Sequence, residues 1–157
     1  MPTTPEAYWP LDKDLQESTG HYTSTLQGKG IFSEQSLLLN GEGFVDSGTR
    51  MLDARDTDFT VMAWVKPTTA TNSSTMIAQT RDDTEGGLGR LILGRYADTA
   101  ENSAKLFTMM GTRLSSTASL LLNTWYHVAV SVDHGDNGKS TISLFINGKL
   151  DNSVTAT

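Results

Sequence analysis

Residues 58–67 read DFTVMAWVKP, and this stretch decides the fold class of the chain. Side chains of an extended strand alternate between two faces, so the apolar odd-numbered residues share one face. The even-numbered residues, which include Met62 and Trp64, share the other face. Because apolar residues occur on both faces, the pattern predicts a central β-strand. Pro67 ends the strand, since proline cannot donate a hydrogen bond to a neighbouring strand.

A second strong pattern begins at Trp125 and ends at Leu150. Alternating valines predict one strand and alternating Ile, Leu and Ile predict its partner, with a polar, glycine-containing turn at residues 133–139 between them. Asn147 and Gly148 predict a second tight turn. Weaker strand patterns, separated by residues typical of turns, lie at Tyr8–Leu11, Ser36–Asn40, Gly43–Asp46, Thr75–Thr80, Leu88–Leu93 and Lys105–Met110.

Helical patterns are scarce. Residues 53–58 could form one turn, and the leucine spacing of residues 115–122 fits a helix, but neither segment combines a cap with sufficient length. The short spacing of the strand patterns predicts an all-β fold, a two-sheet antiparallel sandwich of the jelly-roll type. We expect a single domain over residues 1–157.

The composition excludes several classes of function. The net charge is −6 and the arginines are dispersed, whereas binding to a nucleic-acid backbone needs clustered basic residues. The absence of cysteine excludes disulfides, thiol catalysis and cysteine-ligated zinc. No apolar run approaches the ~20 residues of a membrane span, and the N-terminus lacks the pattern of a secretory signal. Neither nucleic acid nor a membrane span is therefore expected.

Four segments occur in an order and at a spacing typical of a known family. They are YWPLD at 8–12, SLLLNGEGFVD at 36–46, FTVMAWVKP at 59–67, and the pair NTWYHVAV and LFINGK within 123–149. Together they resemble the laminin G-like, concanavalin A-like lectin and glucanase jelly rolls. The resemblance covers the chain from about Tyr8 onward and implies the same two-sheet sandwich.

One departure from the family concerns its last strands. The family usually continues past the Asn147–Gly148 turn with strands that close both sheets, whereas this sequence ends at Thr157. The alternatives are truncation, closing strands supplied by another chain, or a short variant of the domain. Because an unpaired strand edge promotes aggregation, we expect strand complementation or a homo-oligomer to protect it.

The sequence lacks the usual catalytic patterns. Glucanases of this architecture place paired acids on one strand, typically as Glu-x-Asp-x-x-Glu, so that both carboxylates share a face. That pattern is absent, and the densest acidic stretch, residues 52–58, is interpreted as a solvated turn before a strand. No Gly-x-Ser-x-Gly and no metal-binding histidine motif occurs. We therefore predict that the chain is not an enzyme.

Candidate binding residues come from the resemblance. It implies a structural Ca²⁺ with Asp12 as the first candidate ligand, because Ca²⁺ prefers oxygen ligands. Trp9, Trp64 and Trp125 are interpreted as core residues, since each lies in a strand motif that the fold requires. Solvent-exposed segments beside the middle strands carry the ligand face of related domains, and surface charge balance is the alternative for any one residue there. The candidate ligand-binding residues are Arg81, Arg90, Arg95, Tyr96 and Arg113.

These observations favour a non-catalytic carbohydrate-binding or adhesive module of a larger surface, secreted or virion protein. The partner would be a glycan or polysaccharide, met outside the cell or at a cell or virion surface. A structural or assembly domain completed by another chain is the alternative. A polysaccharide hydrolase or lyase is less favoured.

Overall fold

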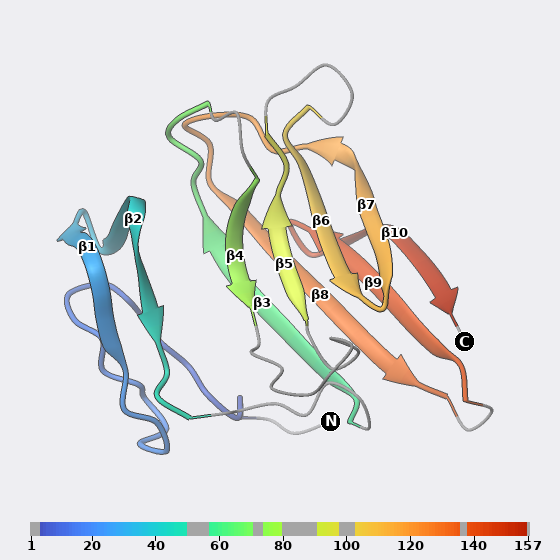
Figure 1. Cartoon of the computed structure of the whole chain (residues 1–157), viewed down its shortest axis with the longest axis horizontal. Helices are drawn as coiled ribbons and strands as arrows, with labels where there is room; N and C mark the ends of the chain where they lie inside the picture. The colour runs from blue at the N-terminus through green and yellow to red at the C-terminus, as the bar shows by residue number, and fades with distance from the viewer. Residues whose placement is uncertain are drawn as a thin grey trace. The chain divides into compact units, whose positions relative to one another are not determined.

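A computed structural model describes residues 4–49, 57–70, 74–79, 91–97, 103–135 and 138–156 (Figure 1). Within these ranges the chain forms ten strands and no helix. The described residues therefore contain no helix that is long and apolar enough to cross a membrane. The chain forms two compact units, Met1–Met51 and Leu52–Thr157.

The N-terminal unit contains one antiparallel hairpin of β1 (Thr25–Ser33) and β2 (Ser36–Asp46). Glu34 and Gln35 form its two-residue turn with left-handed φ angles of 51° and 59°, as a turn that follows the strand twist requires. The register shifts between Gly28 and Gly30. Gly28 has φ 77°, and a Cβ there would collide with the Glu42 carbonyl, so only glycine fits.

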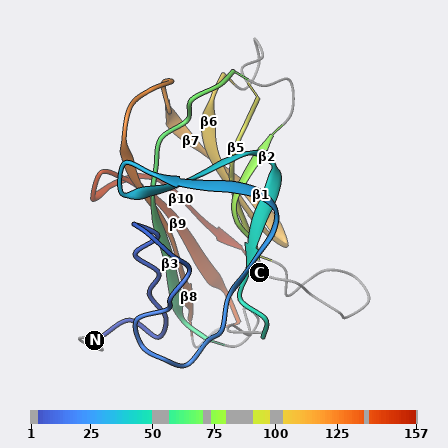
Figure 2. The same cartoon turned by 90° about the vertical axis from the view of Figure 1, so that its left-hand side faces the viewer.

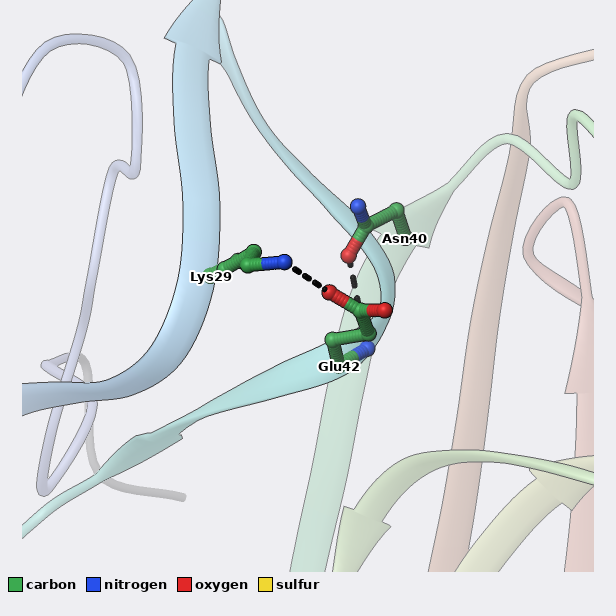
Figure 3. A network of polar contacts seen from close by, with 3 residues as sticks. All are labelled: Lys29, Asn40 and Glu42. Atoms are coloured by element: carbon green, nitrogen blue, oxygen red, sulfur yellow. Dashed lines mark hydrogen bonds and ion pairs between the residues drawn. The ribbon is translucent and has the colours of Figure 1, made fainter.

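An exposed ion pair crosses the same hairpin (Figure 3). Lys29 Nζ lies 2.7 Å from Glu42 Oε2, and the Glu42 amide donates to Asn40 Oδ1 at 3.3 Å. Lys29 and Asn40, with Ile31 and Leu38, line a shallow hollow of about 390 Å³. Because both charged side chains are largely exposed, solvent screens the pair and its contribution to stability is small.

The loop before this hairpin is organised around the buried carboxylate of Glu17. The amides of Tyr8 and Thr19 each donate to its Oε1 at 2.8 Å. The Thr19 hydroxyl donates to Oε2 at 2.7 Å, and the His21 amide does so at 3.2 Å. Burial alone would raise the pKa of Glu17, but these hydrogen bonds together lower the pKa to about 2. The ionised carboxylate thus holds the loop together.

The C-terminal unit consists of two four-stranded antiparallel sheets that lie face to face (Figure 1 and Figure 2). The first sheet has the order β10-β9-β8-β3, and the second has the order β4-β5-β6-β7. In the first sheet the strands are β3 (Phe59–Val65), β8 (Tyr126–His134), β9 (Ser140–Ile146) and β10 (Lys149–Ala156). In the second they are β4 (Thr75–Gln79), β5 (Ile92–Arg95), β6 (Lys105–Met110) and β7 (Thr112–Ser119).

The core lies between the two sheets. Val128, Val130 and Leu144 of the first sheet and Leu93 and Leu106 of the second are fully buried there. Phe59, Val61 and Val65 of β3 pack against this cluster from the first sheet. The predicted two-sheet sandwich is therefore confirmed.

At one side of the sandwich, the edge strands β10 and β7 are joined by side chains. Asp151 sits at a bulge in β10 and accepts hydrogen bonds from Thr117 N at 2.6 Å, Thr117 Oγ1 at 3.0 Å and Ala118 N at 3.2 Å. Asn152 Nδ2 donates to the Ser115 carbonyl at 2.8 Å. We call this set the edge clamp. It closes the sandwich at that side without backbone pairing between the sheets.

Most strand predictions agree with the structure. The late hairpin forms β8 and β9, residues 105–110 form β6, and Asn147 and Gly148 form a left-handed turn with φ 51° and 76°. Three strand predictions in the first half are less accurate. The segments 36–40 and 43–46 form one continuous strand. Residues 8–11 form none, and Leu11 has a left-handed φ of 55°, which does not fit a strand.

Residues 115–119 belong to β7, which agrees with the rejection of a helix there. Two interpretations need correction. Sequence patterns missed β1, in which the two glycines of the bulge interrupt the alternation. Among the described strands, β3 lies at the edge of its sheet and not at the centre, although it is apolar on both faces. Residues 53–56 of the suggested helical turn lie outside the described residues.

Candidate functional site

The outward side of the first sheet carries a row of apolar side chains. Met62 of β3 pairs with Ala129 of β8, Ala129 with Phe145 of β9, and Phe145 with Leu150 of β10. Directly opposed residues of an antiparallel pair share a face, so these four residues cross the sheet as one row. Their sequence neighbours Val61, Val130 and Leu144 point into the core.

The aromatic residues of this side lie next to that row. Trp64 is 66% exposed, and its ring meets the His127 ring edge-on with centroids 5.4 Å apart. Trp125, 45% exposed, precedes His127 by two residues, and Lys66 Nζ lies 6.0 Å from its ring centroid. Met62 and Leu150 are 58% and 61% exposed. We call Met62, Trp64, Trp125, His127, Phe145 and Leu150 the tryptophan face.

The turn after β9 holds His127 in place on this face. The His127 amide donates to Asn147 Oδ1 at 3.0 Å, and the Asn147 amide donates to the His127 carbonyl at 2.7 Å. The ring of His127 is therefore positioned against Trp64 by a backbone that is fixed at both polar groups. A rigid support of this kind lowers the entropy lost when a ligand binds.

A row of hydroxyl groups runs parallel to the apolar row. Thr60 pairs with Ser131, Ser131 with Ser143, and Ser143 with Ser153. Strands of a sheet lie about 4.8 Å apart, so both rows extend for roughly 14 Å across the four strands. The face offers aromatic surface beside small donors and acceptors. This combination suits a ligand with apolar faces and many hydroxyl groups.

Residues 39–157 match the family described as the concanavalin A-like lectin/glucanases superfamily. The chain belongs to this family. The resemblance to laminin G-like, concanavalin A-like domains is thereby confirmed. No curated protein sequence matches the chain significantly.

Two solved structures are similar to this family member. Domain 4 of AbnA, a GH43 extracellular arabinanase from Geobacillus stearothermophilus in complex with arabinotriose, has 19% identity and a TM-score of 0.67. That match covers 96% of this chain and 74% of the domain. A candidate carbohydrate-binding protein from Bacteroides ovatus has 21% identity and a TM-score of 0.44, over 83% of this chain and 41% of its own. At 19% identity the likeness to the arabinanase domain concerns the fold.

The sequence interpretation places all three tryptophans in the core, and this interpretation is wrong for two of them. Trp64 and Trp125 are exposed, whereas Trp9 of the N-terminal unit is half-buried and donates from Nε1 to Ser24 Oγ at 2.6 Å. The alternation in residues 58–67 already put Trp64 opposite the all-apolar side. That signal could have identified the tryptophan face.

The outward side of the second sheet holds two of the predicted ligand-binding residues. Tyr96 stacks on Phe107 with centroids 4.4 Å apart and an interplanar angle of 27°. The Phe107 ring lies over Gly94, where an added Cβ would come within 2.7 Å of it. Arg113 is exposed on β7, opposite Met109 in the register. The structure thus brings Tyr96 and Arg113 to one side of the second sheet.

The other predicted arginines differ in outcome. The expectation of solvent exposure is wrong for Arg95, which is 4% exposed. Its Nε donates to the Leu120 carbonyl at 3.2 Å, so it fixes the segment after β7. Arg81 and Arg90 lie outside the described residues.

The predicted calcium ligand Asp12 is exposed in the N-terminal unit. With Lys13, Asp14 and Gln16 it borders an open hollow of about 370 Å³. In the part of the chain that the structure describes, no three His, Cys, Asp or Glu side chains gather as metal ligands. Since Ca²⁺ takes six to eight oxygen ligands, backbone carbonyls and water would have to supply most of them. Calcium binding at Asp12 stays a prediction.

The acidic stretch before β3 is described only at its end. Asp58 Oδ1 accepts a hydrogen bond from the His134 amide at 2.7 Å, which ties the start of β3 to the end of β8. Residues 52–56 lie outside the described residues. Asp58 therefore has a local structural role.

Proposed function

We propose that this chain is a non-catalytic carbohydrate-binding module and that the tryptophan face is its ligand surface. One observation carries the proposal: Trp64 and Trp125 are both exposed at the outward side of the first sheet. Exposing such large apolar side chains to water is unfavourable, and contiguous apolar patches on proteins mark interaction sites. Tryptophan rings pack against the apolar faces of sugar rings, while hydroxyl groups beside them bind the sugar hydroxyls.

The ligand class follows from the shape and charge of the face. The apolar and hydroxyl rows run across all four strands of the first sheet. An extended, neutral oligosaccharide could lie along both rows, with ring faces on the aromatic side and hydroxyls on the serine and threonine side. The arabinotriose complex of the similar arabinanase domain supports this class of ligand. We further propose that the module belongs to a larger extracellular protein, as that arabinanase domain does.

Affinity electrophoresis with a panel of soluble polysaccharides that includes arabinan tests the proposal. We expect retention by at least one neutral polysaccharide. Trp64→Ala should lower the affinity roughly tenfold or more, because a central tryptophan anchor is typically worth at least ~2 kcal/mol. Leu121→Ala is the matched control, since Leu121 is exposed outside the face. It should bind as the unmodified chain does.

Two results would contradict the proposal. Absence of retention by every polysaccharide would remove carbohydrate binding. If Tyr96→Ala and Arg113→Ala lost binding while Trp64→Ala kept it, the binding site would lie on the second sheet. Incubation of each polysaccharide with the chain, followed by a reducing-sugar assay, should release no product. Release of sugar would overturn the non-catalytic part.

A further inference from the structure

The two edges of the first sheet differ. The β10 edge is joined to the second sheet by the edge clamp. The β3 edge has no hydrogen-bonded strand neighbour among the described strands other than β8 on its inner side. Alternate N–H and C=O groups of an edge strand point outward, where they can pair with another strand.

The β3 edge also lacks the features that keep edges apart. Phe59–Val65 contains seven residues without a charge or a proline, and Met62 and Trp64 are exposed on its outward face. Charged residues, proline and bulges are the usual protection of an edge strand. An uncharged, apolar edge of this length therefore favours pairing with a further strand.

The sequence around β3 is complementary to itself. If two copies run antiparallel with a two-fold axis at Met62, Asp58 of each copy faces Lys66 of the other. Asp58 and Lys66 are both exposed and carry opposite charges. Between these ion pairs, Phe59 faces Val65, Thr60 faces Trp64 and Val61 faces Ala63. We propose that two copies of this chain pair through β3 in this register.

Backbone geometry limits the alternatives. Only every second amide of β3 points outward. The register between two antiparallel copies can therefore shift only by two residues at a time. A shift of two residues moves Asp58 opposite Thr68, which loses both ion pairs, or opposite Trp64, which leaves Asp58 unpaired and sets Lys66 against Asp56. Pro67 lacks an N–H and ends the pairing just beyond Lys66. Only the Met62 register sets both Asp58 and Lys66 against an opposite charge.

The pairing has a consequence for the tryptophan face. The first sheets of two copies would form one continuous sheet, because each contributes its β3 edge. Trp64 of one copy would then lie beside Thr60 of the other, on the outward side of both. A polysaccharide could cross from one copy to the other. The pairing itself rests on β3 and not on carbohydrate binding.

Light scattering after size-exclusion chromatography, with sedimentation velocity over a range of concentrations, tests the pairing. We expect a dimer that dissociates on dilution. Met62→Lys places two like charges opposite each other at the axis and should weaken the dimer roughly tenfold or more. Ser153→Lys adds the same charge on the outward face of β10, at the clamped edge. This control should leave the dimer unchanged.

A charge exchange tests the register. Lys66→Glu sets two acidic residues against each other and should weaken the dimer, whereas Asp58→Lys combined with Lys66→Glu should restore it. Asp58 also bonds His134 N, so thermal melts verify that the double variant folds. If it does not, Met62→Lys decides alone. A monomeric unmodified chain at high concentration, or a dimer that survives Met62→Lys, would overturn the proposal.

Discussion

Replacement of Asp151 by alanine should release β10 from β7. The Asp151 carboxylate accepts hydrogen bonds from Thr117 N at 2.6 Å, Thr117 Oγ1 at 3.0 Å and Ala118 N at 3.2 Å. Among the described residues, no backbone pairing connects these two edge strands. The carboxylate therefore carries most of the polar connection at this side of the sandwich.

The magnitude follows from the number of bonds and their exposure. A hydrogen bond to a charged group contributes ~1.5–3 kcal/mol where it is shielded. Because Thr117 and Ala118 are exposed, water can replace part of the hydrogen bonding that Asp151→Ala removes. We expect a loss of about 2 kcal/mol in the free energy of unfolding, and about half of that for Asp151→Asn, which keeps one carbonyl oxygen as acceptor. For a unit of this size, 2 kcal/mol lowers the Tm by roughly 5–10 °C.

Thermal melts and amide hydrogen exchange together measure this effect. The amides of Thr117 and Ala118 should exchange faster in Asp151→Ala. Thr155→Ala is a matched control on the same strand, because it removes only an exposed hydroxyl contact with Thr141. It should shift the Tm by no more than a degree or two. An Asp151→Ala melt that coincides with this control, with unchanged exchange at both amides, would refute the clamp.

Three further outcomes are expected. Because the pKa of Glu17 is lowered to about 2, its stabilisation of the N-terminal loop is complete above pH ~4.5 and is lost as the pH falls toward 2; the indole N–H signal of Trp9 should report this loss, and Glu17→Gln should remove the pH dependence together with the stability. Thr108→Val should raise stability by ~1 kcal/mol in urea unfolding, because among the described residues the buried Thr108 hydroxyl has no hydrogen-bond partner; a decrease would show that a partner exists. If Asp12 helps to hold Ca²⁺, EDTA should lower the Tm and added Ca²⁺ should restore it; an unchanged Tm would remove the calcium prediction.

The candidate site was only partly accessible from the sequence. The alternation in residues 58–67 separates Met62 and Trp64 from the odd-numbered residues, and the Asn147–Gly148 turn identifies the hairpin that supports His127. The same pattern cannot tell which apolar side faces a second sheet. Family resemblance assigned the tryptophans to the core, and the structure exposes two of them.

The sequence by itself determined most strands of the C-terminal unit and the turn at Asn147 and Gly148, because alternation, Gly, Asn and Pro act on the backbone within a few residues. Tertiary structure decided which side of each strand is buried, since burial depends on what lies across the sheet. Arg95 shows this at one residue: its guanidinium is buried because the Leu120 carbonyl, distant in sequence, accepts its hydrogen bond. Asp151 likewise joins β7 across 33 and 34 residues of sequence. No local pattern encodes contacts of that range, because their strength depends on the packing of both sheets.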